Sequence, residues 1–332
     1  MNRQSIRLLL VAVIWLGFPL LAPAPLIYRP GEGWTYEAVG GEGKWIQPRA
    51  KDQLEVAQAA FNKKAYGLAL KAARRVVQVW PLSDYAPQAQ YLAARCYEAK
   101  GQDEKAFKEY QTILEKYPKI LNYHEILRRQ YEITNRYLAG QWFKLWGYVP
   151  IPGWLSAGID RTAGMYEKVV KNGPYSDVGP QAQMKLGATR EKQEDYQSAV
   201  KAYELAADRY HDQPQVAADA FFLAGLCRQK EAQSAEYDQG AAGQAIGLFT
   251  QFIALYPNDP RVAQAQKIIA ALKTEQARGS FETARFYEHF HKWNGALVYY
   301  NEVLVQDPNS PYAPAARKRL DELKRRAQQP GK

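Results

Sequence analysis

From Asp52 onward, apolar residues recur with a helical period, and β-branched residues almost never alternate with polar ones. A marker alanine recurs along this region at Ala69, Ala106, Ala199, Ala245 and Ala296, with Thr162 as a weaker sixth member. In five of six cases an aromatic residue follows four positions after the marker, and in five of six cases a proline follows twelve positions after it. Twelve positions before the marker a small residue recurs, as Ala57, Ala94, Gly187 and Ala284. A base period of 37 residues with insertions, 19 residues in the third unit, explains the spacing.

This pattern has a direct structural meaning. Two small residues twelve positions apart let two helices approach closely, and the aromatic residue fills the space beside them. Proline then ends the second helix, because it lacks an N–H group. Such helix pairs bury their apolar faces only by stacking. We therefore predict an all-α fold, an α-α superhelix of about six helix pairs over residues 52–326 with a tail at 327–332. The hydrophobic period leaves open a break near Gly173–Pro180.

The pattern resembles the tetratricopeptide repeat. The last unit, which contains Thr283–Tyr287, Ala296–Val303 and Pro308–Ala313, is similar to the ends of the BamD family, as are the helix ends Leu114–Pro118 and Tyr256–Pro260. BamD proteins are exported tetratricopeptide proteins of the machinery that assembles outer-membrane β-barrels. The resemblance implies a scaffold that holds unfolded outer-membrane proteins or β-barrel assembly subunits. It also implies that the protein is located in the periplasm and is associated with a membrane, the outer membrane in preference to the inner.

The N-terminus has the three parts of an export signal. Arg3 and Arg7 precede the apolar run Leu8–Leu21, and small residues follow at 22–24. Pro25 is a poor neighbour for signal cleavage, so residues 1–27 are either a signal peptide or a signal anchor. In the second case residues 8–27 attach the chain to a membrane. BamD proteins usually carry a lipidated cysteine here, but no cysteine occurs before Cys96.

Residues 28–51 are rich in glycine and tryptophan, which predicts an extended linker. The string Gly41–Trp45 is not a phosphate-binding loop, because Trp45 occupies the position where Ser or Thr must bind magnesium.

A groove along the first helices is the expected binding surface. Side chains three positions before and one after the small residue share a helical stripe. They are Leu54 and Gln58, Tyr91 and Arg95, and Met184 and Ala188. Tyr91, Arg95 and Glu98 together would form an amphipathic patch suited to an extended peptide. The alternative is a solvated groove wall without a dedicated ligand.

The insertion at 141–157 carries five aromatic residues in its first fifteen positions. They are Trp142, Phe143, Trp146, Tyr148 and Trp154, with Lys144 as the one charged residue. Tryptophan and tyrosine are common at protein interfaces and in the membrane headgroup layer. The loop therefore packs onto its own solenoid, docks a partner or contacts a membrane. Our hypothesis is that Trp146 or Trp154 anchors a protein partner.

Catalytic and metal chemistry find little support. His289 and His291 flank Phe290 at a helix turn, where a surface position is the ordinary interpretation. Cys96 and Cys227 fall within first helices and are expected to pack as small hydrophobic residues. Glu191, Glu194 and Asp195 lie in a turn between repeat helices, where we expect solvated side chains. We predict no enzyme, no metal, no cofactor and no small-molecule substrate.

The charge points to an acidic partner or an anionic surface without choosing between them. Lys and Arg number 44 against 34 Asp and Glu, and the last 16 residues hold seven basic and two acidic residues. No aromatic residue follows Tyr312, so the tail lacks the stacking residues of a nucleic-acid interface, and we expect no nucleic acid. The leading function is the BamD-like scaffold. The alternative is a membrane-anchored general adaptor of the cell envelope, in cell division or secretion. A third class is an enzyme accessory or cell-wall-binding subunit.

Overall fold

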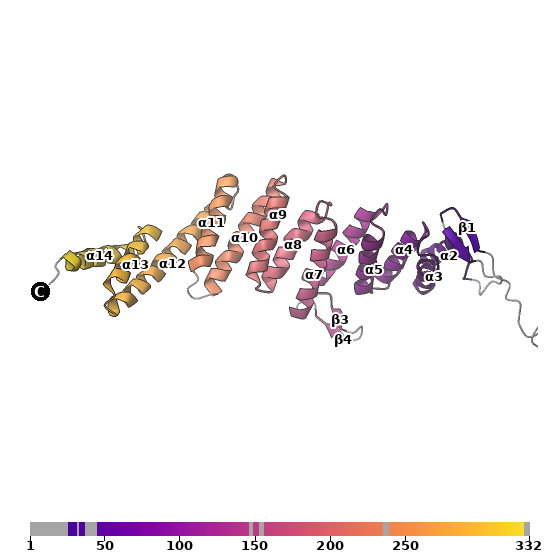
Figure 1. Cartoon of the computed structure of the whole chain (residues 1–332), viewed down its shortest axis with the longest axis horizontal. Helices are drawn as coiled ribbons and strands as arrows, with labels where there is room; N and C mark the ends of the chain where they lie inside the picture. Colours follow the sequence, from indigo (N-terminus) through magenta and orange to yellow (C-terminus); the bar gives the residue numbers. More distant parts are fainter. Residues whose placement is uncertain are drawn as a thin grey trace, which may run out of the picture. The chain divides into compact units, whose positions relative to one another are not determined.

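The computed structural model describes residues 26–31, 33–36, 45–145, 149–152, 156–234 and 239–328. The chain divides into two compact units, Met1–Tyr123 and His124–Lys332. Within each unit, consecutive helices lie side by side along the chain (Figure 1). The predicted all-α superhelix of helix pairs is therefore confirmed.

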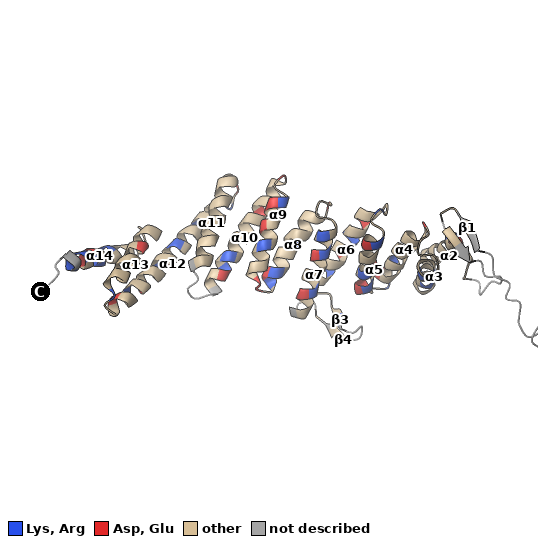
Figure 2. Cartoon of the chain, in the orientation of Figure 1, with Lys and Arg blue, Asp and Glu red and all other residues tan. Residues whose placement is uncertain are grey.

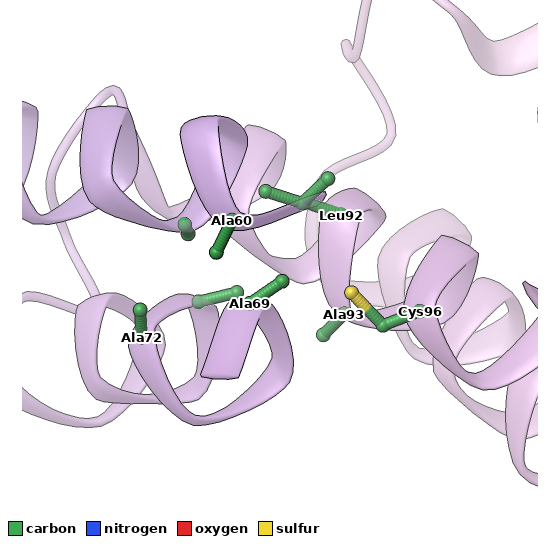
Figure 3. Packing of buried hydrophobic residues seen from close by; sticks show 8 residues of the cluster. Ala60, Ala69, Ala72, Leu92, Ala93 and Cys96 are labelled. Atoms are coloured by element: carbon green, nitrogen blue, oxygen red, sulfur yellow. The ribbon is translucent and has the colours of Figure 1, made fainter. Parts of the chain in front are cut away.

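The first unit contains two helix pairs. They are α2 (Ala50–Asn62) with α3 (Tyr66–Val79), and α4 (Ala86–Ala99) with α5 (Asp103–Lys116). Each helix packs on the next one. The core between α2, α3 and α4 consists largely of alanine, and Figure 3 shows its side chains gathered from the three helices: Ala60 from α2, Ala69 and Ala72 from α3, and Leu92, Ala93 and Cys96 from α4. Because these side chains are small, the helix backbones come close together, as the alanine pattern predicts.

The second unit contains four helix pairs and a final helix in its described part. The pairs are α6 (Tyr123–Leu138, which begins at the last residue of the first unit) with α7 (Ser156–Asn172), α8 (Gly179–Lys192) with α9 (Tyr196–Arg209), α10 (Pro214–Ser234) with α11 (Gln239–Leu255), and α12 (Val262–His289) with α13 (Trp293–Gln306). Helix α14 (Ala313–Gln328) packs on α13 and covers the last pair. The count agrees with the six pairs expected from the repeat.

The turn inside five of the pairs closes in the same way. The residue after the turn donates its backbone N–H to a carbonyl five positions earlier, as in Gln102 to Tyr97 and Asp195 to Arg190. This is the Schellman ending of a helix, which needs a residue with positive φ. Glycine takes that position at Gly101 (φ 66°), but His291 (φ 55°) takes it in the last pair. The histidine that the sequence places at a helix turn thus has a structural role there.

The insertions differ in form from one unit to the next. The extra residues before Ala296 lengthen a helix, since α12 has 28 residues where α4 and α8 have 14. The insertion in the third unit instead forms a hairpin of two antiparallel strands, β3 (Phe143–Leu145) and β4 (Val149–Ile151). The sequence set this segment apart as a loop inserted into the helical region, and it did not predict the two strands that the segment contains.

Part of the predicted linker is also a hairpin. Strand β1 (Leu26–Arg29) pairs with β2 (Gly33–Tyr36), and the Gly31 carbonyl accepts a hydrogen bond of 2.8 Å from the backbone N–H of Asp84. Gln53 is fully buried at the start of α2, where its side chain accepts from the Gln47 N–H at 2.9 Å and donates to the Trp45 carbonyl at 3.1 Å. An extended tether is therefore the wrong description of these residues, because both segments are held by hydrogen bonds to the helical unit.

The division between the units falls at Tyr123/His124 and not near Gly173–Pro180. Helices α7 and α8 belong to one unit and pack together. A Cβ atom on Gly179 would lie 2.3 Å from the Pro174 carbonyl oxygen, so the chain between these helices is tightly closed.

Among the described helices, none has both the length and the apolar character that a membrane crossing requires. The predicted signal segment at 1–27 lies outside the described residues except for its last two positions, so its role stays a prediction.

Candidate protein-binding groove

A groove of about 520 Å³ lies in the first unit, lined by α2, by α4 and by the chain that follows α5. The residues at its wall include Leu54, Gln58, Tyr91 and Arg95, which are the four that the small-residue register selects in the first two pairs. Apolar side chains dominate the rest of the wall, which contains Phe61, Pro87, Leu92, Ile120 and Leu121. Three charged side chains, those of Asp84, Arg95 and Lys119, also line it.

Tyr91 and Arg95 lie one helical turn apart on α4, so their side chains meet. The Arg95 guanidinium donates to the Tyr91 hydroxyl at 3.2 Å and lies over the Tyr91 and Phe61 rings, 5.8 and 5.7 Å from their centroids. The Tyr91 ring packs in turn against Tyr110 of α5, with 6.0 Å between centroids. The groove thus presents aromatic faces and a guanidinium held by them, groups that suit apolar side chains and backbone carbonyls of an extended chain.

Glu98 has a different place from the one expected. It is absent from the groove wall, and its carboxylate accepts a hydrogen bond of 2.8 Å from the Tyr110 hydroxyl. The same bond recurs as Tyr203 to Glu191 at 3.3 Å and Tyr300 to Glu288 at 2.7 Å. The aromatic marker of the repeat therefore has a polar partner twelve residues earlier, which fixes the two helices of a pair to each other.

Glu191 is correspondingly no solvated turn residue. Besides the Tyr203 hydroxyl it contacts the Lys230 ammonium of α10 at 2.6 Å, which raises the pKa of that lysine. Burial raises the pKa of Tyr203 far above its ordinary value, and the Glu191 charge adds to the shift.

The third pair of the register does not extend the groove in the same form. Met184 on α8 packs against two buried clusters, one with Tyr203 and the other with Tyr210. The packing of Met184 therefore indicates a residue of the core and not of the groove.

The aromatic insertion is only partly described. Trp142 is 55% exposed, whereas Phe143 is buried, stacked on Tyr137 at 4.0 Å between centroids and covered by the Arg161 guanidinium at 5.7 Å. One aromatic residue of the segment thus packs onto its own unit and its neighbour does not. Trp146, Tyr148 and Trp154 lie outside the described residues.

A second groove, of about 630 Å³, lies between α12 and α14 in the second unit. Its wall contains Phe281 and Arg285, which stand three positions before and one after the small residue Ala284. This is the offset of Tyr91 and Arg95 from Ala94. The register had predicted groove residues only next to Ala57, Ala94 and Gly187, but the same offsets from Ala284 identify this groove as well.

The cysteines are buried and free, as their positions in the repeat predict. Burial raises the pKa of the Cys96 thiol to about 11 and that of Cys227 to about 12. Both thiols therefore stay protonated and unreactive at neutral pH. The described part of the chain contains no group of three His, Cys, Asp or Glu side chains arranged to hold a metal ion.

Comparison with protein families gives a match to most of the second unit. The model of a family described as "Outer membrane lipoprotein" (YfiO) matches residues 161–327, half of the chain. The chain belongs to this outer membrane lipoprotein family. A tetratricopeptide repeat model also matches residues 88–119, which cover most of α4 and all of α5. The resemblance to a BamD-like tetratricopeptide protein is thus confirmed. The region matched to the outer membrane lipoprotein family contains the second groove, and the single repeat match contains Tyr91 and Arg95.

Solved structures similar to this family member are distant in sequence. The C-terminal part of a tetratricopeptide repeat protein from Cytophaga hutchinsonii is 14% identical over 81% of this chain and 87% of its own, with a TM-score of 0.33. A thermophilic tetratricopeptide protein from Thermus thermophilus is 14% identical over 66% of this chain and 98% of its own, with a TM-score of 0.28. YrrB, a tetratricopeptide protein described as having an unusual peptide-binding site, is 13% identical over 66% of this chain and 92% of its own, with a TM-score of 0.33. No curated protein sequence matches the chain.

Proposed function

We propose that this chain is an exported, non-catalytic scaffold of the cell envelope that acts in outer-membrane β-barrel assembly. In this role it binds unfolded barrel precursors or partner subunits through the groove at Tyr91 and Arg95. The proposal is supported by membership of the outer membrane lipoprotein family and by the pattern of residues 1–27, which predicts a signal peptide or signal anchor. Aromatic rings, aliphatic side chains and one guanidinium on a single groove wall are the observation that carries it.

The groove fits an extended segment with alternating apolar side chains. In an extended chain successive side chains point to opposite sides, so every second residue would contact the wall. Tyr91, Phe61 and Leu92 offer apolar contact to those residues, and Arg95 offers donors to the backbone carbonyls between them. Strands of membrane-spanning barrels have this alternation in their sequences, which is why unfolded barrel precursors suit the groove.

The test is affinity purification of the tagged full-length protein from crosslinked cells. We expect a large β-barrel protein to co-purify with the wild-type chain. The double variant Tyr91→Ala/Arg95→Glu should reduce its recovery about tenfold, since it removes the ring and reverses the charge at the groove wall. Lys71→Glu is the matched control, because Lys71 is exposed on the second helix of the first pair and does not line the groove. Equal recovery by the two variants would contradict the groove as the binding site.

The alternative function, a membrane-anchored general adaptor in cell division or secretion, has one observation in its favour. Both cysteines of the sequence, Cys96 and Cys227, are buried within helices of the repeat, so neither offers the lipidation site of a lipoprotein. Membrane attachment would then come from residues 8–27. Outer-membrane fractionation of the chain supports the assembly role, whereas inner-membrane residence with an intact N-terminus supports the adaptor.

The aromatic insertion is a second proposed docking element. Trp142 exposes half of its surface beside the hairpin, and Trp146, Tyr148 and Trp154 follow in the sequence. We propose that Trp146 or Trp154 anchors a partner. Changing both to Ala should remove one crosslinked partner from the purification and leave binding at the Tyr91 groove unaltered. Unchanged partners and unchanged membrane fractionation would rule out docking.

A further inference from the structure

The groove between α12 and α14 has a wall of unusual charge. Its floor is the Tyr300 ring, which packs against Phe281 with 5.6 Å between centroids. Trp293 lies at the wall, and the guanidinium of Arg326 lies 5.8 Å from the centre of its ring. Arg285 of α12 and Lys318 of α14 also line the groove. The site therefore combines aromatic rings with two cations that come from different helices.

The two carboxylates in the groove share one cation. Glu288 accepts from the Tyr300 hydroxyl at 2.7 Å and forms an ion pair with Arg319, and Glu322 binds the same guanidinium. Arg285 and Lys318, by contrast, are exposed and form no hydrogen bond or ion pair within the described residues. The three cations of the groove, Arg285, Lys318 and Arg319, exceed its two carboxylates, so the net charge of the groove wall is positive.

The surroundings strengthen that charge. Helix α14 carries six basic residues and two acidic ones, and its Lys and Arg positions are coloured blue in Figure 2. Phe286 and Phe290, which are sequence neighbours of the groove residues Arg285, His289 and His291, are 61% and 55% exposed and lie 4.8 Å apart between centroids. The first groove differs, because its wall is mainly aliphatic and aromatic and its arginine is held by two rings.

We propose that the groove between α12 and α14 binds an acidic, extended segment of a partner protein. Its carboxylates would pair with Arg285 and Lys318, and its apolar side chains would contact Trp293 and the Phe286–Phe290 pair. The partner is a protein segment and not an anionic membrane, because the two cations face a recessed groove with an aromatic floor, whereas a flat bilayer contacts protruding charges. This inference rests on the proposed scaffold function and adds a second site with a different ligand chemistry.

The test uses full-length protein in detergent micelles and fluorescein-labelled peptides of twelve residues. The acidic peptide has Ser at every second position and Glu or Phe at the positions between. Its matched neutral peptide has Gln in place of Glu. We expect the acidic peptide to bind at least tenfold more tightly than the neutral one, and its affinity to fall severalfold between 50 and 300 mM salt, because the attraction is between exposed charges. Equal affinity for the two peptides would overturn the proposal.

Two variants test whether the acidic peptide binds in the groove. Arg285→Glu/Lys318→Glu should lower the affinity for the acidic peptide at least tenfold. Lys267→Glu is the matched control, since Lys267 is exposed on α12 but does not line the groove, and it should change the affinity less than twofold. All three residues are exposed, so circular dichroism melts of the variants should match the wild type. A double variant that folds and binds as well as the wild type would overturn the proposal.

Two further probes separate this inference from its alternatives. Vesicles with 30% phosphatidylglycerol that bind the wild type and displace the acidic peptide would assign the groove to a membrane and overturn the protein-segment proposal. An uncharged peptide that alternates Phe and Leu with Ser reports on the Tyr91 groove, and the Arg285/Lys318 variant should leave its binding unchanged. If that peptide binds and the acidic one does not, the inference fails while the proposed function stands.

Discussion

At the scale of single residues, the aromatic marker of the repeat has two functions. Its ring fills the space between the helices of a pair, and in three of the four tyrosine markers the hydroxyl donates to a glutamate twelve positions earlier. Tyr110, Tyr203 and Tyr300 donate to Glu98, Glu191 and Glu288, whereas Tyr166 has Trp154 at that position and donates to Asn135 instead. In two cases the glutamate continues to a cation of a following helix, Lys230 or Arg319. Each of these linked contacts, a hydrogen bond followed by an ion pair, connects a helix pair to the helix that follows it.

Removing one hydroxyl tests this role. Tyr300→Phe keeps the ring of a residue that is 1% exposed and deletes its bond to Glu288. We expect a loss of about 1 kcal/mol in the free energy of unfolding, since one hydrogen bond to a charged acceptor disappears while Arg319 still binds that acceptor. Tyr175→Phe, at an 82% exposed residue, should change nothing. Urea unfolding followed by circular dichroism measures both, and a loss equal at the two sites would contradict the interpretation.

The cysteines give a prediction about pH. Because burial raises the thiol pKa in the folded chain, from 9.0 to about 11 for Cys96 and to about 12 for Cys227, the unfolded chain loses these protons first as the pH rises. The stabilisation is therefore complete below about pH 9 and declines above it. Urea midpoints should be level between pH 7 and 8.5 and fall by pH 10, and the decline should be shallower in Cys96→Ala/Cys227→Ala.

Thiol labelling provides an independent check on the same residues. In the native protein at pH 8, a thiol reagent such as dithionitrobenzoate should react with neither cysteine, whereas both should react in 8 M urea. Rapid labelling of either thiol in the folded chain would show that it is accessible as a thiolate, contrary to its burial.

At the scale of helices, close approach depends on the smallest side chains. A Cβ atom on Gly187 would lie 2.6 Å from the Tyr203 ring. Gly187→Ala should therefore destabilise the chain by about 1–2 kcal/mol, because the strain of overpacking exceeds the better helix propensity of alanine. Gly247→Ala is the control, since Gly247 also lies in a helix and an added Cβ would meet nothing within 4 Å. It should be neutral or stabilising, and thermal melts that rank the two in the opposite order would contradict the packing.

The sequence predicted helix pairs well because small residues, aromatic residues and prolines recur at fixed offsets. It predicted less about the insertions, because their conformation does not follow a repeating pattern of residues. The extra residues before Ala296 form additional turns of α12, and the insertion after α6 forms a hairpin. The spacing of the markers gives the length of an insertion but not its conformation. Short strands such as Phe143–Leu145 have no alternation long enough to detect.

The sequence predicted only the part of the groove whose residues follow the repeat. Leu54, Gln58, Tyr91 and Arg95 share one wall, as the register implies. Glu98 and Met184 do not, because each has a partner inside its own unit: the Tyr110 hydroxyl for Glu98 and the buried cluster around Tyr203 for Met184. Such partners depend on the tertiary arrangement and not on helical spacing.

At the scale of the whole molecule, the stack needs closed ends. Each helix pair buries its face against the next pair, so the last pair requires a cover. Helix α14 provides it, since Ala316, Leu320 and Leu323 pack on Ala296, Tyr300 and Val303 of α13. The opposite face of α14 carries the basic residues, which gives the helix a structural side and a charged side.

Disrupting this cover should have a local effect. Leu320 is 5% exposed, and Leu320→Asp would place a charge without a partner against Tyr300 and Val303. We expect a loss of about 4 kcal/mol, combining the missing apolar contacts with the cost of burying a carboxylate. Because each pair contacts its neighbours only, hydrogen exchange should accelerate in α13 and α14 and stay unchanged in α8 and α9. Lys324→Asp, on the exposed side of α14, should leave exchange unaltered throughout. If protection fell equally in α8 and α14, the second unit would unfold as one cooperative body, and the nearest-neighbour description of its stability would be wrong.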